Sequence, residues 1–231
     1  MDDVTAVTVD SYSTLVDVDS QVTVLSEVAG LDPAAAEAVS GTWRTQYLVY
    51  SMLANDINAY RPFRDLIDMG LSYALAVHGH EVDAETRDRV RREVYHERLD
   101  VFDDVRPGVG RLVDAGYPVF VLSNGDPGML DHLVEAAGIK DLIGGTVSAD
   151  EVETYKPNVE IYRHGAARVG APISEIVHVS GGGMRDVWGA KHAGMKTAWL
   201  ARPEKRLPRE SLGPEPDAVV ESLGEVADRL A

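Results

Sequence analysis

The chain has 231 residues, with 38 acidic and 22 basic side chains and a formal net charge of −16. This charge repels nucleic acid phosphates and anionic membrane surfaces, so we expect neither as a partner. The absence of Cys excludes disulfides, thiolate metal sites and a cysteine nucleophile. The length of the chain allows either one large domain or a core domain with an insertion.

The sequence also indicates where the protein works. Its amino-terminal segment, MDDVTAV, is acidic where a signal peptide carries positive charge, and no apolar run reaches the length of a membrane span. We therefore expect a cytoplasmic protein. An excess of carboxylates combined with 5 Lys against 17 Arg keeps a protein hydrated in strong salt, so the composition indicates a halophilic source.

The first predicted element is a strand over residues 4–9, which ends at Asp10 and leads into a polar loop over residues 11–14. From about residue 21 to residue 99 the apolar residues have helical spacing, and no strand is evident. We therefore predict a helical block between the first strand and the rest of the chain.

Beyond Pro107 the sequence alternates between amphipathic helices and short apolar strands. The strands are expected within residues 117–125, 143–148, 175–183, 196–202 and 217–222. This alternation is typical of a parallel sheet covered by helices on both faces, so the predicted fold class is α/β. We predict a core of residues 1–17 and 100–231, and a helical cap over residues 18–99 that covers the site and excludes water.

Polar groups follow three of the predicted strands, at the sheet edge where ligands bind in such folds. Asp10 is either a nucleophilic carboxylate or an ordinary turn residue. Ser123 and Asn124 either offer a hydroxyl and an amide to an anion or cap the next helix. The glycines at 181–183 allow the backbone to approach a ligand closely. Asp186 is an acid, a metal ligand or a carboxylate at a helix N-terminus.

Two basic residues and the histidines complete the candidates. Lys156, before Pro157, either neutralises a substrate anion, orients the nucleophile or is a surface charge. Arg44, beside Trp43 and near Tyr47, either faces an apolar pocket or packs along a helix surface. The sequence has no His pair at metal-ligand spacing and no P-loop. We expect surface or packing roles for His78, His80, His96, His164, His178 and His192.

Taken in order, these residues resemble the motifs of the haloacid dehalogenase superfamily of hydrolases, over nearly the whole chain. Residues 10–14 (DSYST) are similar to the first motif and Ser123-Asn124-Gly125 to the second. Lys156-Pro157 is similar to the third motif, and Asp186 in RDVWGAKHAGM to the fourth. The resemblance implies a Rossmann-like, three-layer core with a parallel sheet and a cap inserted after the first strand.

Tyr12 and Gly181 point to one branch of this superfamily. Its phosphatases generally carry a second Asp two residues after the nucleophile, where this chain has Tyr12, and a magnesium-binding Asp at the position of Gly181. A phosphate beside Asp10 would need that metal. Tyr12 instead resembles the L-2-haloacid dehalogenases (type II). This resemblance implies a hydrolase without metal or other cofactor, a small anionic carboxylate as substrate, and a homodimer formed through the cap.

In that branch an Asp displaces halide from C2 of a 2-haloacid, and water then hydrolyses the resulting ester to a 2-hydroxy acid. The resemblance implies catalytic roles for Asp10, Thr14, Arg44, Ser123, Lys156 and Asp186. Asp10 is the nucleophile, Arg44 receives the halide, and Asp186 belongs to the hydrolytic step. Ser123 and Lys156 hold the substrate carboxylate or the nucleophile. The residues implied for substrate binding are Ser11, Tyr12, Phe63, Asn124, Tyr162, Gly181, Gly183 and Arg185.

The fourth motif departs from the dehalogenase pattern, which usually reads close to Ser-Ser-Asn-Ala-Trp-Asp. Here Gly181 and Gly183 replace the Ser and the Asn, and Arg185 replaces the Trp and could contact a larger or more anionic substrate. Ser13 also replaces a usual Gly. Two alternatives stay open. One is a magnesium-dependent phosphatase of a small phosphate ester that uses Asp186 as metal ligand, and the other is a catalytically weakened binding protein of the same fold.

Overall fold

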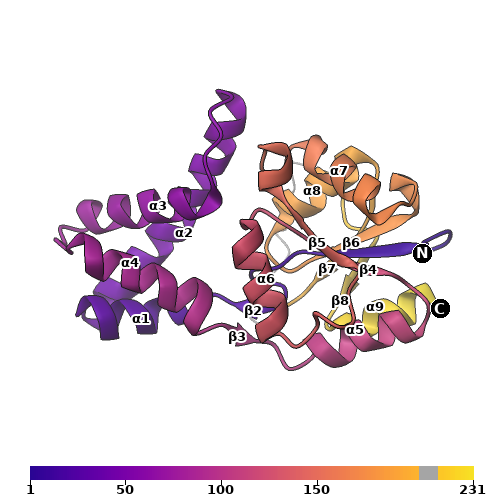
Figure 1. Ribbon diagram of the computed structural model, residues 1–231, viewed down its shortest axis with the longest axis horizontal. Helices are drawn as coiled ribbons and strands as arrows, with labels where there is room; N and C mark the ends of the chain where they lie inside the picture. Colours follow the sequence, from indigo (N-terminus) through magenta and orange to yellow (C-terminus); the bar gives the residue numbers. More distant parts are fainter. Residues whose placement is uncertain (203–212) are drawn as a thin grey trace. The chain divides into compact units, whose positions relative to one another are not determined.

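The computed structural model describes residues 1–202 and 213–231 and divides into two compact units (Figure 1). We call Met1–Val16 together with Val101–Ala231 the α/β unit, and Asp17–Asp100 the helical unit.

A six-stranded parallel sheet forms the centre of the α/β unit. Its strands, in spatial order, are β5 (Gly145–Ser148), β4 (Val119–Ser123), β1 (Ala6–Val9), β6 (Ile176–Ser180), β7 (Lys196–Leu200) and β8 (Ala218–Val220). The predicted α/β fold class with a parallel sheet is confirmed.

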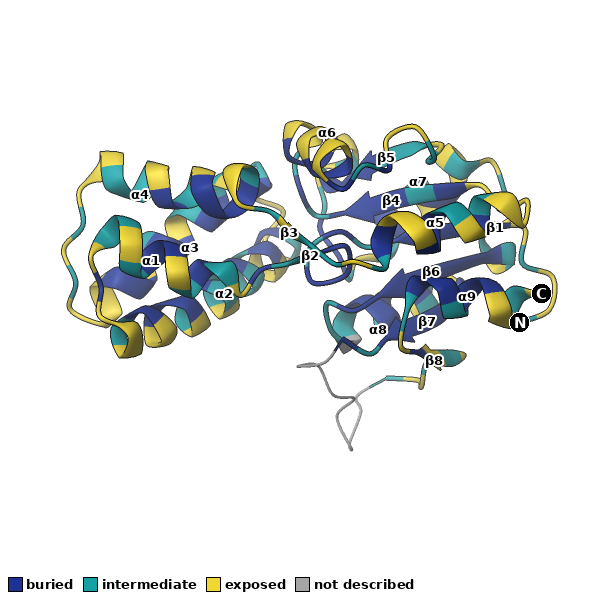
Figure 2. Ribbon diagram, turned by 90° about the horizontal axis from the view of Figure 1, so that it is seen from below, coloured by how far each residue is buried: buried dark blue, intermediate teal, exposed yellow. Residues whose placement is uncertain are grey.

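Helices cover the sheet on both faces. On one face α5 (Val105–Asp114) packs against α9 (Leu223–Leu230), and on the other α7 (Val159–Val169) packs against α8 (Met184–Ala193) (Figure 1). A further helix of this unit, α6 (Pro127–Ala136), contacts β5. Two short 3-10 turns, η2 (Ala149–Val152) and η3 (Ile173–Glu175), precede α7 and β6, respectively. The helices are buried where they meet the strands and exposed outward (Figure 2).

Burial on both faces explains why the central strands are continuous apolar runs. All four residues of β1 (AVTV) and all five of β6 (IVHVS) are buried, so neither strand shows the alternation of a half-exposed sheet. From β1 the chain continues to β4 and β5 on one side, and then crosses over to β6 on the other side. In folds of this kind, ligands bind at the carboxyl ends of the strands where the strand order reverses, which here are the ends of β4, β1 and β6.

The helical unit contains α1 (Ser20–Ala29), α2 (Pro33–Asp56), α3 (Phe63–Val77) and α4 (Ala84–Arg92), followed by a π-helical turn, η1 (Glu93–Glu97). The N-cap Asp32 accepts a 3.0 Å hydrogen bond from the Ala35 N–H and starts α2. In the core, Trp43 donates through Nε1 to the Ile67 carbonyl at 2.8 Å and lies edge-to-face with Tyr95. α2 and α3 pack against each other along this core.

The chain passes between the units in two short strands, β2 (Val16–Asp17) and β3 (Asp100–Val101), which pair in a two-stranded sheet. Across residues 1–202 and 213–231, no helix combines the length and the apolarity that crossing a bilayer requires.

Candidate active site

The polar residues predicted at the strand ends meet at the carboxyl edge of the sheet. Asp10 follows β1, while Ser123 and Ser180 are the last residues of β4 and β6. Register brings these ends level, because Val9 pairs with Val121 on one side and with Val179 on the other. The fold therefore gathers residues that are more than a hundred positions apart in the sequence.

Asp10 is held at both carboxylate oxygens. Its Oδ1 accepts a 3.0 Å hydrogen bond from Lys156 Nζ, and its Oδ2 accepts a 3.1 Å bond from Thr14 Oγ1. The Thr14 hydroxyl in turn accepts the N–H of Gly181 at 2.8 Å, which ties the loop after β1 to the loop after β6. The Asp10 side chain is 13% exposed. It is thus a fixed carboxylate that remains accessible to a small molecule.

Lys156 lies between two carboxylates. Its Nζ is 3.0 Å from Asp10 Oδ1 and 2.9 Å from Asp186 Oδ2, and the side chain is only 4% exposed. The Lys156 backbone N–H donates to Asn124 Oδ1 at 2.9 Å, so the loop after β4 positions the lysine. Because a buried cation compensates two buried anions, the three side chains together carry a net charge of −1.

Asp186, in the first turn of α8, is the most heavily bonded carboxylate of the site. Its Oδ1 accepts a 2.6 Å hydrogen bond from the Tyr162 hydroxyl and lies 3.0 Å from His178 Nε2. Burial by itself raises the pKa of Asp186, but the Lys156 charge, followed by His178 and the Tyr162 hydroxyl, outweighs it and holds the pKa well below the usual range. Burial, reinforced by the Asp186 charge, raises the pKa of Tyr162 well above its usual value. Asp186 is therefore ionised and Tyr162 is neutral.

The loop after β4 is braced by buried hydroxyls. Ser123 Oγ shares a short hydrogen bond with Ser11 Oγ and accepts the N–H of Gly125 at 3.1 Å. Ser148 Oγ donates to the Gly125 carbonyl at 2.6 Å. Ser11 and Ser123 are predicted to bind or hold substrate. In the structure both side chains are buried, and their hydroxyls share a hydrogen bond with each other. A β-carbon on Gly125 would lie 3.5 Å from Cε2 of Tyr12, so the Tyr12 ring lies beside this loop.

The glycine loop after β6 packs directly against the nucleophile. A β-carbon on Gly181 would lie 2.6 Å from the Ser13 carbonyl oxygen, and one on Gly182 would lie 3.0 Å from Asp10 Oδ2. Gly182, which is absent from the predicted set, is thus the glycine beside the nucleophile. Gly183 has a φ of 133°, and Arg185 Nη1 lies 3.5 Å from the place its β-carbon would take. At Gly181, any larger residue would displace the loop, because its β-carbon would collide with the Ser13 carbonyl oxygen.

Ser13, which replaces the glycine usual at its position, has a φ of 66°. This left-handed conformation favours glycine but admits other residues. Its backbone N–H donates to the Val16 carbonyl at 2.8 Å. The chain therefore keeps the turn after Asp10 despite the added side chain.

The predicted residues Arg44 and Phe63 belong to the helical unit. There, Arg44 Nη1 donates to Asp19 Oδ1 at 2.9 Å, and the Arg44 side chain is 26% exposed. Phe63 is buried and lies edge-to-face with Tyr47 at 5.6 Å between ring centroids. The role of these residues in halide binding stays a prediction.

The prediction of a surface or packing role for His178 is wrong in its surface part, because the residue is fully buried in β6. Besides packing there, it bonds Asp186 and the Thr8 hydroxyl, which the prediction did not include. The signal in the sequence was a titratable residue inside an otherwise apolar strand run, two positions before the polar strand end. In the described part of the chain, no three His, Asp or Glu side chains are grouped so that they could hold a metal ion.

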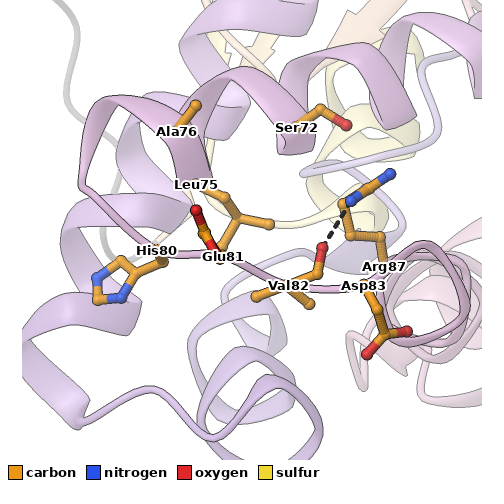
Figure 3. A pocket seen from close by; sticks show the side chains of 8 residues that line it. All are labelled: Ser72, Leu75, Ala76, His80, Glu81, Val82, Asp83 and Arg87. Atoms are coloured by element: carbon orange, nitrogen blue, oxygen red, sulfur yellow. Dashed lines mark hydrogen bonds between the residues drawn. The ribbon is translucent and has the colours of Figure 1, made fainter.

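A separate cavity of about 540 Å³ lies within the helical unit (Figure 3). It lies between α3 and the start of α4, with an apolar side that includes Leu75 and Val82. His80 and Asp83 point in different directions, and Arg87 donates to the Val82 carbonyl. The polar side chains do not converge on a common point. The cavity contains none of the predicted catalytic residues.

Comparison with known proteins agrees with this geometry. Residues 4–194 match the haloacid dehalogenase-like hydrolase family. The chain is 31% identical over 228 residues to an (S)-2-haloacid dehalogenase of Pseudomonas sp. (strain YL), covering 99% of this chain and 95% of that protein. It is 32% identical over 202 residues to (S)-2-haloacid dehalogenase 4A of Burkholderia cepacia, covering 87% and 85%.

A solved structure shows the same similarity. The L-2-haloacid dehalogenase from Xanthobacter autotrophicus superposes with a TM-score of 0.87 at 28% identity, over 97% of each chain. The similarity therefore extends over both the α/β unit and the helical unit.

Proposed function

Because this chain belongs to the haloacid dehalogenase-like hydrolase family, we propose that it is a metal-independent L-2-haloacid dehalogenase. It hydrolyses the carbon–halogen bond of a 2-haloacid to give a 2-hydroxy acid. The observation that carries this proposal is the Asp10 carboxylate, held by Thr14 on one oxygen and by Lys156 on the other. The similarity to two (S)-2-haloacid dehalogenases over most of the chain supports it.

In the first step an Asp10 oxygen attacks C2 of the substrate. A carbon–oxygen bond forms while the carbon–halogen bond breaks, and the halide leaves with the bonding electron pair. Because Thr14 and Lys156 hold the two carboxylate oxygens in place, orienting the nucleophile for attack costs little further entropy. Arg44 is proposed to receive the halide. The Asp10 charge disappears on ester formation, which leaves Lys156 and Asp186 as a compensated pair.

In the second step water attacks the Asp10 carbonyl carbon, not C2. The bond between that carbon and the ester oxygen breaks, one water proton reaches the leaving alkoxide, and the other is released to solvent. The product carries away an oxygen of Asp10, and the water oxygen replaces it. Asp186, which is ionised, keeps Lys156 next to the carbon under attack.

Lys156 also supports the proposal that no metal is needed. Its ammonium stands between Asp10 and Asp186, the two carboxylates that would hold magnesium under the phosphatase alternative, and already supplies positive charge there. Tyr12 provides no carboxylate two residues after the nucleophile. The phosphatase alternative predicts activity that depends on magnesium, and the binding-protein alternative predicts ligand binding without turnover.

The test is bromide release from L-2-bromopropionate, with EDTA and high KCl present. We expect turnover by the native protein and a loss of at least about 1000-fold in Asp10→Asn, because the nucleophile is removed. Asp131→Asn, at an exposed position on α6, is the matched control and should be fully active. A single turnover in ¹⁸O-water should label Asp10, as read by peptide mass spectrometry.

Two results would contradict the proposal. Activity that requires magnesium would favour the phosphatase. A folded native protein that binds L-2-bromopropionate but releases no bromide would favour the binding protein.

We further propose that the protein is a homodimer through the helical unit. Exposed apolar side chains gather on α2 and α3, which pack against each other. Met69, Tyr73 and Val77 are spaced four residues apart on one face of α3 and are 41%, 43% and 56% exposed, and Met52 and Leu53 on α2 are 37% and 46% exposed. Light scattering after gel filtration should give twice the 25.0 kDa chain mass.

The dimer proposal has its own variant. Tyr73→Glu combined with Val77→Glu should give a monomer, because charges would be buried in the interface. Arg64→Glu, at the exposed start of the same helix, is the control for added charge. A native protein that runs as a monomer at micromolar concentration rules the dimer out.

A further inference from the structure

His178 is a buried titratable residue to which the mechanism above assigns no task. It is the middle residue of β6 and is 0% exposed. Parallel pairing places it opposite Thr8 of β1. Its ring lies edge-to-face with Tyr162, with 5.6 Å between centroids and 78° between planes. His178 and Tyr162 therefore pack against each other and contact the same carboxylate, that of Asp186.

Both ring nitrogens of His178 have polar partners. Nδ1 lies 2.9 Å from Thr8 Oγ1, and Nε2 lies 3.0 Å from Asp186 Oδ1 and 3.4 Å from Lys156 Nζ. A neutral imidazole carries one N–H and one lone pair. The partners therefore decide which nitrogen holds the proton.

Only one neutral tautomer satisfies all of these groups. With the proton on Nε2, the ring donates a hydrogen bond to the Asp186 carboxylate. Nδ1 then accepts a hydrogen bond from the Thr8 hydroxyl. Among the described residues, that hydroxyl has no other hydrogen-bond acceptor. With the proton on Nδ1, a nitrogen lone pair would face the carboxylate oxygen at 3.0 Å, and the Thr8 proton would lack an acceptor. Buried polar groups left unpaired in this way are costly.

The Nε2–H tautomer also determines how Lys156 uses its protons. An ammonium has three N–H donors, and those of Lys156 reach Asp10 Oδ1 and Asp186 Oδ2. Because Nε2 already carries a proton, it cannot accept the third. That N–H remains for the carboxylate of the substrate.

We propose that His178 is a positioning residue of the dehalogenation reaction, which acts as an Nε2–H donor to Asp186 and so leaves one N–H of Lys156 for the substrate. Together with the Tyr162 hydroxyl it holds Asp186 Oδ1, so that Oδ2 faces Lys156. This inference rests on the proposed function.

Protonation of His178 would undo this arrangement. Two charged groups face the ring, Asp186 from α8 and Lys156 from the segment after η2, and Asp10 lies on the other side of Lys156. The neutral titratable group that faces the ring is Tyr162 from α7. A second cation would stand 3.4 Å from the ammonium, and Nδ1 could no longer accept from Thr8. The arrangement therefore depends on the neutral ring.

Three substitutions separate the donor from the ring volume. His178→Gln can place an amide N–H where Nε2–H lies, His178→Phe fills the volume without a donor, and His178→Asn reaches only the Nδ1 position. We expect kcat to fall on the order of 10- to 100-fold in the Phe and Asn variants, as for other positioning hydrogen bonds to charged groups, and to stay within about threefold in the Gln variant.

His192→Gln, at an exposed position on α8, is the control for removing a histidine. Equal activity in the native, Phe and Gln forms would overturn the proposal. Equal losses in the Phe and Gln variants would also overturn it, because they would show a packing role alone.

The tautomer can be measured without turnover. In a long-range ¹H–¹⁵N spectrum of the native protein at neutral pH, the imidazole whose signals vanish in His178→Gln should show a protonated Nε2 and an unprotonated Nδ1. The opposite tautomer, or a doubly protonated ring, would overturn the proposal even if the Phe variant does not fold. A native protein with this tautomer but without bromide release would contradict the proposed function alone.

Discussion

Asp186 shows how one residue reconciles burial with charge. Desolvation disfavours its carboxylate, but Lys156, His178 and Tyr162 stabilise the ionised form more strongly. Such a group links folding to pH. Since its pKa is lower in the folded state than its ordinary value of 3.8, its contribution to stability is complete above pH 3.8 and is lost as the pH falls towards the folded-state value.

Asp186→Asn should therefore reduce the free energy of unfolding most at neutral pH, by about 3–5 kcal/mol, because it leaves Lys156 with one carboxylate fewer. The difference between native and variant should shrink as the pH is lowered below about 4, because only the native protein loses this stabilisation. Urea unfolding at a series of pH values, in constant KCl, measures this difference. A difference that stays constant over the range would contradict the assignment.

At the scale of elements, the junction of β6 and α8 is the tightest part of the site. Gly181→Ala would push a methyl group against the Ser13 carbonyl oxygen and displace the N–H that Thr14 accepts. We expect a loss of about 1–3 kcal/mol in the free energy of unfolding and a fall of about tenfold in kcat. Thermal unfolding and halide release measure the two effects.

Gly110→Ala is the matched control for that substitution. Gly110 lies in α5 with open space around its Cα, so the added methyl should stabilise the protein by about 0.5–1 kcal/mol and leave kcat unchanged. If both variants behave alike, the loop after β6 is not packed as described.

Local sequence patterns were sufficient for the elements and for the residues at their ends. Apolar runs located the strands, and the polar groups that follow β1 and β4 led to Asp10 and Ser123. Lys156 and Asp186 were candidates with several possible roles, and only the motif resemblance chose among these roles. Their place beside Asp10 depends on how the loops return to the sheet, which local pattern does not show.

The hydrogen-bond partners of His178 and the position of Gly182 could not be predicted from the sequence pattern. The partner of His178 across β1 is Thr8, and this pairing is set by strand register between segments 170 residues apart. Gly182 faces Asp10 because of a loop conformation in which Gly181 and Gly183 take the other positions. A titratable residue inside an apolar strand run was a local sign of His178, but its partners and the position of Gly182 depend on tertiary structure.

For the whole molecule, a net charge of −16 on 231 residues makes self-repulsion a property of the folded state. Raising KCl from about 0.01 M to about 0.5 M shortens the screening length from about 30 Å to a few Å, so Tm should rise by several degrees. Differential scanning calorimetry at fixed pH measures this rise. A Tm that is flat or falls over the range would argue against a salt-adapted protein.

The pairing of β2 with β3 has a consequence for how such a molecule can change over evolutionary time. The chain leaves the α/β unit at Val16 and returns to it at Val101, and these residues lie on two paired strands, which are about 4.8 Å apart in a sheet. In topological terms the whole helical unit is an insertion between two paired strands. A turn of two or three residues would close the same gap, so this segment can be lengthened, replaced or removed at one place without rerouting any strand of the sheet.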